Sequence, residues 1–168
     1  DNVSPAIFGS LSSSCTTDNK EAVTVKYDVD DRFNFLALIP DFETSTEEAR
    51  KVMPENIKLQ DAIYSLSRLG SVIKAFETYD LALLKKVMGD KIHEPYRKEI
   101  IHEYDEVKSI CEKIDSAAFF ISGSGSTLMN IVSAEKNIEK IQSELDKLTH
   151  NWKAILLKVD KEGTVVLN

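Results

Sequence analysis

The sequence predicts an α+β domain in which helices cover one face of a mainly antiparallel sheet. Segments with the alternation or the continuous apolar character of β-strands recur along the chain. Amphipathic helical segments lie between them in pairs, without the regular strand-helix-strand order of a parallel sheet. The length of 168 residues, with 42% hydrophobic and 29% charged residues, is enough for one globular core.

The first thirty residues are predicted to form a β-hairpin. Residues 22–29 alternate in polarity, which is typical of a half-buried strand, and residues 6–17 are the expected partner strand. Asp18, Asn19 and Lys20 are expected to make the turn, because Asp and Asn side chains bond their own backbone and tolerate a left-handed conformation.

A buried strand and a capped helix are predicted next. Residues 33–39, which are apolar except for Asn34, predict a buried strand that Pro40 ends. Ser45 and Glu48 have the spacing of a capping box, in which each side chain bonds the other residue's backbone N–H. A helix of two or three turns is therefore expected before Pro54.

Two longer helices are predicted in the middle of the chain. Apolar residues at helical spacing predict one helix over 59–76 and another over 81–88, with Gly89 as its end. Residues 93–97 interrupt the pattern, because Pro95 disfavours a helical conformation in the residue before it.

Strands and helices alternate in the C-terminal third. Serine and glycine residues separate two of the strands, and Glu162 and Gly163 are expected to make a turn. The predicted elements are a helix over 107–114, strands over 117–121 and 127–132, a helix over 138–148, and a closing strand pair over 152–159 and 164–167.

Composition and charge argue against several classes of protein. The formal charge of −7 repels a polyphosphate backbone, so no nucleic-acid partner is expected. The longest apolar run, at 117–121, is far shorter than a membrane-spanning helix, so no membrane is expected either. Cys15 and Cys111 are isolated, which predicts no disulfide, no metal site and a cytoplasmic location.

A glycine-rich loop is the strongest local signal for ligand binding. Two glycines separated by one small residue leave backbone N–H groups open to an anion such as phosphate. An ordinary β-turn is the other interpretation of so short a motif. The loop consists of Ser122, Gly123, Ser124, Gly125 and Ser126.

Two arginines are candidates for binding a carboxylate or a phosphate, because a guanidinium can bond either group through two donors. They are Arg50, in the capped helix, and Arg97, after Pro95. Surface ion pairing is the other interpretation of each arginine taken alone. The histidines have no Ser or Cys partner at a recognisable spacing, so no catalytic triad is expected.

Four blocks of the sequence together resemble the homoserine kinase family of the GHMP (galactokinase, homoserine kinase, mevalonate kinase, phosphomevalonate kinase) superfamily. The blocks are DNVSPAIFG at 1–9, PDFETSTEEAR at 40–50, DKIHEPYR at 90–97 and ISGSGST at 121–127. The similarity covers the whole chain but only the C-terminal part of the family's length.

The resemblance implies a domain organisation and a function. Residues 1–30 would end the N-terminal kinase domain with a hairpin, and residues 31–168 would form the GHMP kinase C-terminal domain, a ferredoxin-like α/β sandwich. The activity would be ATP-dependent phosphorylation of the L-homoserine hydroxyl to O-phosphohomoserine, in threonine biosynthesis.

The resemblance also implies roles for individual residues. Asn2 would lie near the reacting hydroxyl as a catalytic residue, with Asp1 beside it in the homoserine pocket. Arg50 and Arg97 would clamp the substrate carboxylate, with Thr46 beside them. The loop over 122–126 would support the phosphate; Ser126 stands where the family usually has Pro, which can loosen this loop.

ATP and Mg²⁺ are the implied cofactors, bound mostly by an N-terminal half that this chain lacks, so the isolated chain is expected to be inactive. A homodimer is implied as well. Three alternatives stay open: another GHMP kinase of a small alcohol, a non-catalytic α+β ligand-binding domain, and a site completed by a separate N-terminal chain.

Overall fold

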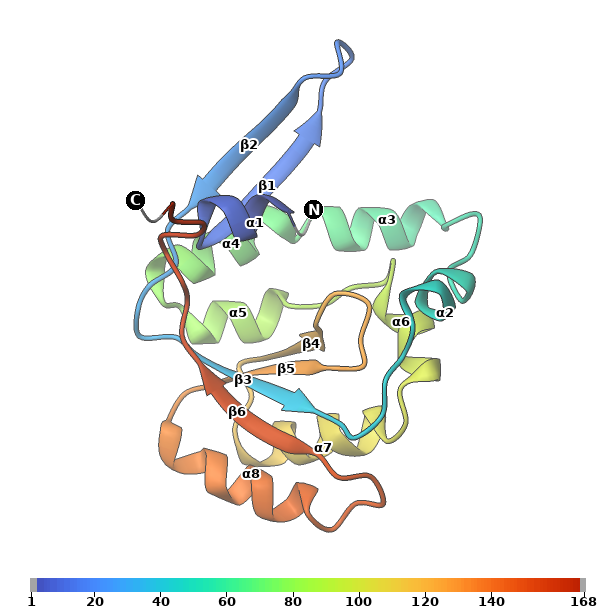
Figure 1. Cartoon of the computed structure of the whole chain (residues 1–168), viewed down its shortest axis with the longest axis vertical. Helices are drawn as coiled ribbons and strands as arrows, with labels where there is room; N and C mark the ends of the chain where they lie inside the picture. The colour runs from blue at the N-terminus through green and yellow to red at the C-terminus, as the bar shows by residue number, and fades with distance from the viewer. Residues whose placement is uncertain (1–2, 167–168) are drawn as a thin grey trace.

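A four-stranded antiparallel sheet with the order β4-β5-β3-β6 forms the centre of the computed structural model, which describes residues 3–166 (Figure 1). Helix α7 (Tyr104–Ile114) is the last of several helices between β3 and β4, and α8 (Ile138–Leu145) lies between β5 and β6. This is the predicted ferredoxin-like arrangement. The strands are β3 (Asn34–Ile39), β4 (Ala118–Ile121), β5 (Leu128–Val132) and β6 (Lys153–Leu157).

Helices α7 and α8 cover one face of the sheet, as the sequence predicts. Leu36 and Leu38 of β3 are 0% exposed and belong to one core cluster with Val107 of α7 and Ile141 of α8. Burying each of these side chains stabilises the fold by about 1.5–3 kcal/mol. The antiparallel register, with Leu36 opposite Asn130, fixes which side chains share this face.

Further helices lie on the opposite side of the sheet, which the sequence does not predict. Figure 1 shows α5 (Leu81–Val87) above the sheet and α7 with α8 below it. Phe35, on the other face of β3, stacks on Phe76 of α4 (Leu69–Thr78) with ring centroids 6.1 Å apart. The buried residues of this second cluster are Val29, Phe33, Ala75, Phe76, Leu84, Ala117, Ala118 and Ile131.

The single helix predicted over 59–76 is wrong, because the chain forms α3 (Leu59–Leu66) and then α4. Arg68 explains the break: its Nη1 donates to the carbonyl oxygen of Tyr64 at 2.7 Å, and its guanidinium lies 3.3 Å from the centre of the Tyr64 ring. This side chain satisfies a carbonyl at the end of α3. Helix α3 buries none of its residues among those described.

The hairpin forms a separate two-stranded sheet that projects from the rest of the molecule (Figure 1). Strands β1 (Leu11–Thr16) and β2 (Ala22–Tyr27) pair antiparallel. The first strand was predicted to begin at Ala6, which is wrong: α1 (Val3–Phe8) precedes it. Proline is tolerated in a first helical turn, and the Gly9 N–H donates to the carbonyl oxygen of Pro5 at 2.9 Å.

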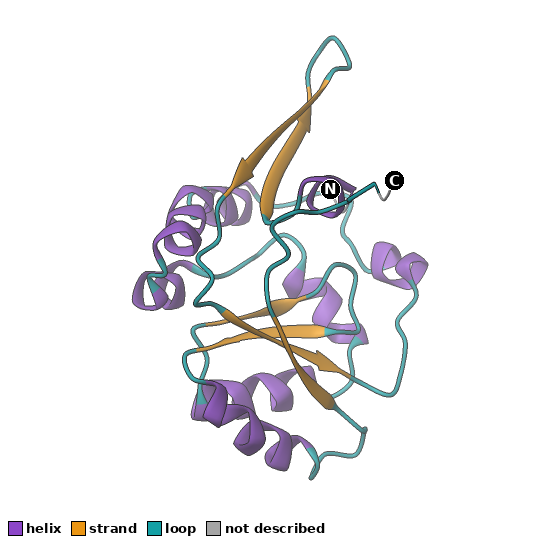
Figure 2. Cartoon of the chain, turned by 60° about the vertical axis from the view of Figure 1, so that its left-hand side comes forward, coloured by secondary structure: helices purple, strands orange, loops and turns teal. Residues whose placement is uncertain are grey.

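Of the predicted closing strand pair, the first strand is confirmed as β6, which pairs with β3, but its predicted partner is wrong. Residues 164–166 are not a strand, and Leu167 lies outside the described residues. The Thr164 N–H donates to the carbonyl oxygen of Ile7 at 3.1 Å, so this segment binds α1 instead of β6. Figure 2 shows the segment beside α1, at the base of the hairpin. Gly163 has φ 74°, and a side chain there would collide with the backbone of Ile7.

Short elements complete the chain. The predicted capping box begins a helix that ends at Lys51, two residues before the expected Met53. No helix in the described residues is long and apolar enough to span a bilayer. The short elements are α2 (Thr46–Lys51), α6 (Glu94–Arg97), η1 (Lys98–Ile100) and η2 (Glu135–Asn137).

Candidate functional site

A polar pocket of about 490 Å³ lies between α2, α6 and the loop that joins β4 to β5. It brings together residues that are far apart in the sequence. Five of the predicted site residues line it: Thr46, Arg50, Arg97, Gly123 and Ser124. The other residues of its lining are Asp90, His93, Glu94, Phe120 and Ile121. Asp1 and Asn2 lie outside the described residues.

Helix α2 presents Thr46 and Arg50 to this pocket because its first turn is fixed. The Ser45 hydroxyl accepts from the Glu48 N–H, and the Glu48 carboxylate accepts from the Ser45 N–H, both at 3.1 Å. These bonds hold the pKa of Glu48 below its ordinary value. Ala49 is buried, which orients the helix, and Arg50 next to it is exposed.

Asp90 positions α6, on the other side of the pocket. Its carboxylate accepts from the N–H groups of Ile92, His93 and Glu94 at 2.8, 2.6 and 2.7 Å, and from the Ser65 hydroxyl at 3.2 Å. Burial raises the pKa of Asp90, but the three N–H bonds outweigh it, so that the net pKa is lowered. Asp90 therefore fixes the turn that leads into α6, whose N-cap residue is His93.

Arg97 joins α6 to the glycine loop. Its Nη1 donates to the carbonyl oxygen of Gly123 at 2.7 Å. Its Nε is buried and has no acceptor among the described residues. A buried donor without a partner costs about 1–3 kcal/mol, so this arrangement of Arg97 lowers the stability of the fold by that order.

The glycine loop has two backbone N–H groups engaged and others open. Ser122 and Gly125 donate within the loop, to Thr127 and Ser122, at 2.9 and 3.0 Å. The N–H groups of Gly123 and Ser124 have no acceptor in residues 3–166. Gly125 has φ 89°, a backbone conformation that favours glycine.

Ser126 does not line the pocket but anchors its loop. Its hydroxyl donates to the carbonyl oxygen of Phe42 at 2.8 Å, and the residue is buried. A serine in place of proline was expected to loosen the loop. The Ser126 hydroxyl instead forms a bond to Phe42 that a proline could not form.

Glu94 was not predicted as a site residue, although it lies in the same sequence block as Arg97. It precedes Arg97 by three residues, so both side chains lie on one face of α6. Burial raises the pKa of Glu94. The three-residue spacing between Glu94 and Arg97 was the signal in the sequence that could have found Glu94. Its burial in the pocket wall could not be seen from the sequence.

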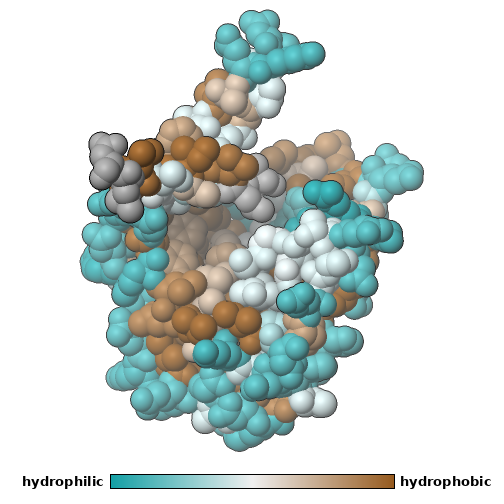
Figure 3. Space-filling view, in the orientation of Figure 1, coloured by the Kyte–Doolittle hydropathy of each residue, from teal (hydrophilic) through white to brown (hydrophobic). Residues whose placement is uncertain are grey.

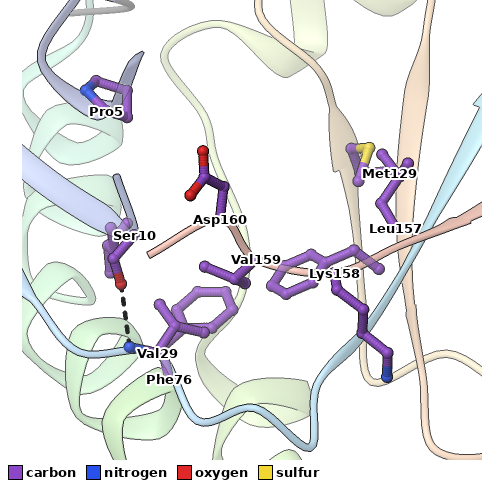
Figure 4. A pocket seen from close by; sticks show the side chains of 11 residues that line it. Pro5, Ser10, Val29, Phe76, Met129, Leu157, Lys158, Val159 and Asp160 are labelled. Carbon is purple, nitrogen blue, oxygen red and sulfur yellow. Dashed lines mark hydrogen bonds between the residues drawn. The ribbon is translucent and has the colours of Figure 1, made fainter. Parts of the chain in front are cut away.

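A second cavity, of about 370 Å³, is mostly apolar (Figure 4). It opens where the surface is hollowed between α1 and the sheet (Figure 3). Its charged residues are engaged elsewhere: Asp160 accepts from the Glu162 and Gly163 N–H groups, and Lys158 bonds Asn34. The polar pocket is therefore the better candidate for a charged ligand.

Comparison with known proteins identifies the class to which this fold and pocket belong. Residues 72–151 match the family described as "GHMP kinases C terminal". The crystal structure of homoserine kinase from Cytophaga hutchinsonii matches with a TM-score of 0.84 at 22% identity, over 96% of this chain and 52% of that one. The fold is therefore that of a GHMP kinase C-terminal domain, and residues 72–151 match that family in sequence.

Its sequence relatives within that class are homoserine kinases. A homoserine kinase of Clostridium botulinum is 41% identical over 100% of this chain, which spans 57% of that protein. One from Petrotoga mobilis is 36% identical over 100% of this chain, which spans 55% of it. The resemblance seen in the four sequence blocks is confirmed along the full length of the chain.

Proposed function

We propose that this chain supplies the homoserine-binding part of a homoserine kinase. The reaction is transfer of a phosphoryl group from ATP to the hydroxyl of L-homoserine, which gives O-phosphohomoserine for threonine biosynthesis. The observation that carries the proposal is the position of Arg50 and Arg97 on one pocket with the glycine loop.

The two arginines bind the substrate carboxylate in this proposal. A guanidinium bonds a carboxylate through two parallel N–H donors, and bonds between charged groups are about twice as strong as neutral ones. Arg97 keeps its Nη1 bond to the Gly123 carbonyl oxygen while its side chain lines the pocket with Arg50. Thr46, one turn before Arg50 on α2, offers a hydroxyl beside the same group.

The open N–H groups of Gly123 and Ser124 suit the transferred phosphoryl group, as backbone amides suit any anion. Asn2 and Asp1 are proposed to approach the reacting hydroxyl. The described residues contain no group of three or more His, Cys, Asp or Glu side chains that could hold a metal ion, and the Asp90 carboxylate accepts from backbone N–H groups. ATP and Mg²⁺ are therefore proposed to bind mainly to residues outside this chain.

The chain alone is expected to be catalytically inactive, because it spans about 57% of its curated relative. Residues 1–30 are proposed to belong to the missing kinase domain and residues 31–168 to the C-terminal domain. A cytoplasmic location and a homodimer remain part of the same proposal. Formation of ADP from ATP and L-homoserine by the purified chain would contradict the expected inactivity.

Binding of L-homoserine to the chain and its variants tests the proposal. We expect Arg50→Ala and Arg97→Ala each to weaken binding by about tenfold to a hundredfold, since bonds to charged groups contribute about 1.5–3 kcal/mol. Lys51→Ala, next to Arg50 on α2, is the control and should bind normally. Titration calorimetry or ligand-observed NMR gives the affinities.

Two results would favour the alternatives. Tighter binding of another small alcohol with a carboxylate, such as mevalonate, would indicate a different GHMP kinase. Binding of homoserine that neither arginine variant weakens, or no binding at all, would reject the proposed site.

A further inference from the structure

The polar pocket contains opposite charges on separate parts of its wall. Its lining has two guanidinium groups, on Arg50 and Arg97, and two carboxylates, on Asp90 and Glu94. Asp90 is not available to a ligand, since its two oxygens accept four hydrogen bonds from Ser65 and the start of α6. Glu94 therefore carries the pocket's remaining negative charge among the described residues.

Glu94 is a partly buried carboxylate without a cationic partner. Its one hydrogen bond in the described part of the chain comes from the hydroxyl of Tyr104, which is 4% exposed. No lysine, arginine or histidine of residues 3–166 lies within ion-pairing distance of it. A buried carboxylate of this kind is normally paired with a cation, because burial disfavours an isolated charge.

Two lysines, Lys98 and Lys108, attract the Glu94 carboxylate without forming an ion pair with it. Lys98 Nζ lies 3.2 Å from the carboxylate of Asp105. Lys108 Nζ lies 5.9 Å from the centre of the Tyr104 ring and 6.0 Å from that of Phe119. Both lysines act on Glu94 only through longer-range attraction, as Asp90 does through repulsion.

We infer that Glu94 determines substrate specificity by receiving the α-ammonium group of an amino acid whose carboxylate lies on Arg50 and Arg97. The inference rests on the proposed function and deepens it, since it states how the pocket separates an amino acid from a hydroxy acid. Cations and anions on the wall match the two charges of a zwitterion. A ligand without the ammonium group leaves Glu94 unpaired.

The protonation state of Glu94 should change when an amino acid binds. Burial is the main cause that raises the pKa of Glu94, opposed by the Tyr104 bond and by Lys108 and Lys98, and reinforced by Asp90. An ammonium group favours the ionised carboxylate and lowers its pKa again. L-homoserine should therefore release a proton on binding at mildly acidic pH, whereas a ligand without the ammonium group should not.

The deciding experiment compares L-homoserine with 4-hydroxybutanoate, which lacks only the α-amino group. We expect the chain to bind L-homoserine at least tenfold more tightly. Glu94→Gln, which can still accept the Tyr104 bond, should remove most of this preference by weakening homoserine binding and leaving 4-hydroxybutanoate unchanged. Glu99→Gln is the matched control, because Glu99 is an exposed acid five residues further along, and it should change neither affinity.

Each outcome decides between the two proposals. Equal affinities of the unaltered chain for both ligands, or equal weakening of both by Glu94→Gln, would overturn the role of Glu94 and leave the arginine site intact. Binding of neither ligand would overturn the proposed function and this inference together. Proton release, measured by calorimetry in buffers of different ionisation enthalpy, needs no variant; its absence with L-homoserine would also count against Glu94.

Discussion

Arg97 Nη1 donates to the carbonyl oxygen of Gly123 at 2.7 Å, so a side chain of α6 holds the backbone of the β4–β5 loop. The two segments are separated by the whole of α7 and β4 in the sequence. Gly123 has φ 60°, a backbone conformation that favours glycine. The arginine proposed to bind substrate therefore also determines where the loop lies.

Replacing Arg97 by Met should loosen the loop. The variant loses a hydrogen bond from a charged donor, and the amides of Ser122 and Gly125, which donate within the loop, should exchange with solvent several times faster. The free energy of unfolding should fall by about 1 kcal/mol. Hydrogen exchange measured by NMR checks both effects. Arg50→Met is the control, because Arg50 has no bond to the loop among the described residues; faster exchange in both variants would contradict the link.

Gly125→Ala should destabilise the fold more than Gly123→Ala. Both positions have a positive φ, 89° and 60° respectively, so each substitution adds backbone strain of about 1–3 kcal/mol. At Gly125 a new Cβ would also lie 2.9 Å from Ile101 Cδ1, whereas at Gly123 it would meet open space. Urea unfolding of the two variants gives the comparison. Equal losses would show that Ile101 moves aside freely.

Asp90→Asn should reduce stability by about 1.5–3 kcal/mol at neutral pH, because the carboxylate bonds to the start of α6 are charge-assisted. The folded-state pKa of Asp90 is lowered from 3.8, so its contribution is complete above that pH and is lost as pH falls through the lowered pKa. The difference between the two proteins should therefore shrink in acid. Denaturant unfolding from pH 7 to pH 3 measures it.

A suitable control for that measurement is Asp105→Asn. Asp105 is exposed and makes a surface ion pair with Lys98, so its replacement should change stability by less than about 1 kcal/mol. If Asp90→Asn lowers the free energy of unfolding by the same amount at every pH, packing rather than charge holds α6 in place.

Ser45→Ala should cost about 1 kcal/mol and fray α2, because the Glu48 N–H loses its acceptor. Affinity for L-homoserine should fall as well, since α2 carries Arg50. Ser143→Ala serves as control: that hydroxyl donates to Lys140 in an exposed part of α8, away from the pocket. Thermal unfolding and the homoserine titration together check the prediction, and unchanged affinity with reduced stability would separate the cap from the site.

The periodicity of apolar residues predicted the sheet and most of the helices, because in those segments the apolar positions are the ones that the fold buries. Residues 33–39 are apolar except for Asn34, and the strand they form is buried on both faces by the two helical layers. The break between α3 and α4 was not predictable from apolar spacing, which continues across it. It depends on where the Arg68 side chain folds back, onto Tyr64.

The ends of the chain were harder to predict. Small and β-branched residues around Ala6 favour a strand locally, but the backbone of Ile7 finds its partner at Thr164, almost the whole chain away. Residues 164–166 also have the composition of a strand, but they form no strand because Thr164 bonds Ile7 instead. Tertiary contacts overrode local preference in both segments.

The candidate site was predicted through the family resemblance more than through local chemistry. Arg50 and Arg97 could each have been ordinary surface residues. Only the resemblance of their two sequence blocks to the homoserine kinase family suggested that they line one pocket. Asp90 and Glu94 were missed because acidic residues near a helix start are common. Their importance comes from bonds that the sequence does not display, to backbone N–H groups and to Tyr104.

The contact between Ile7 and Thr164 brings the two ends of the described chain together at the base of the hairpin. A short linker could therefore connect the ends, and new termini could be opened at the exposed turn over 18–20 without cutting any strand of the central sheet. Such a circular permutant would keep α2, α6 and the glycine loop in their present order.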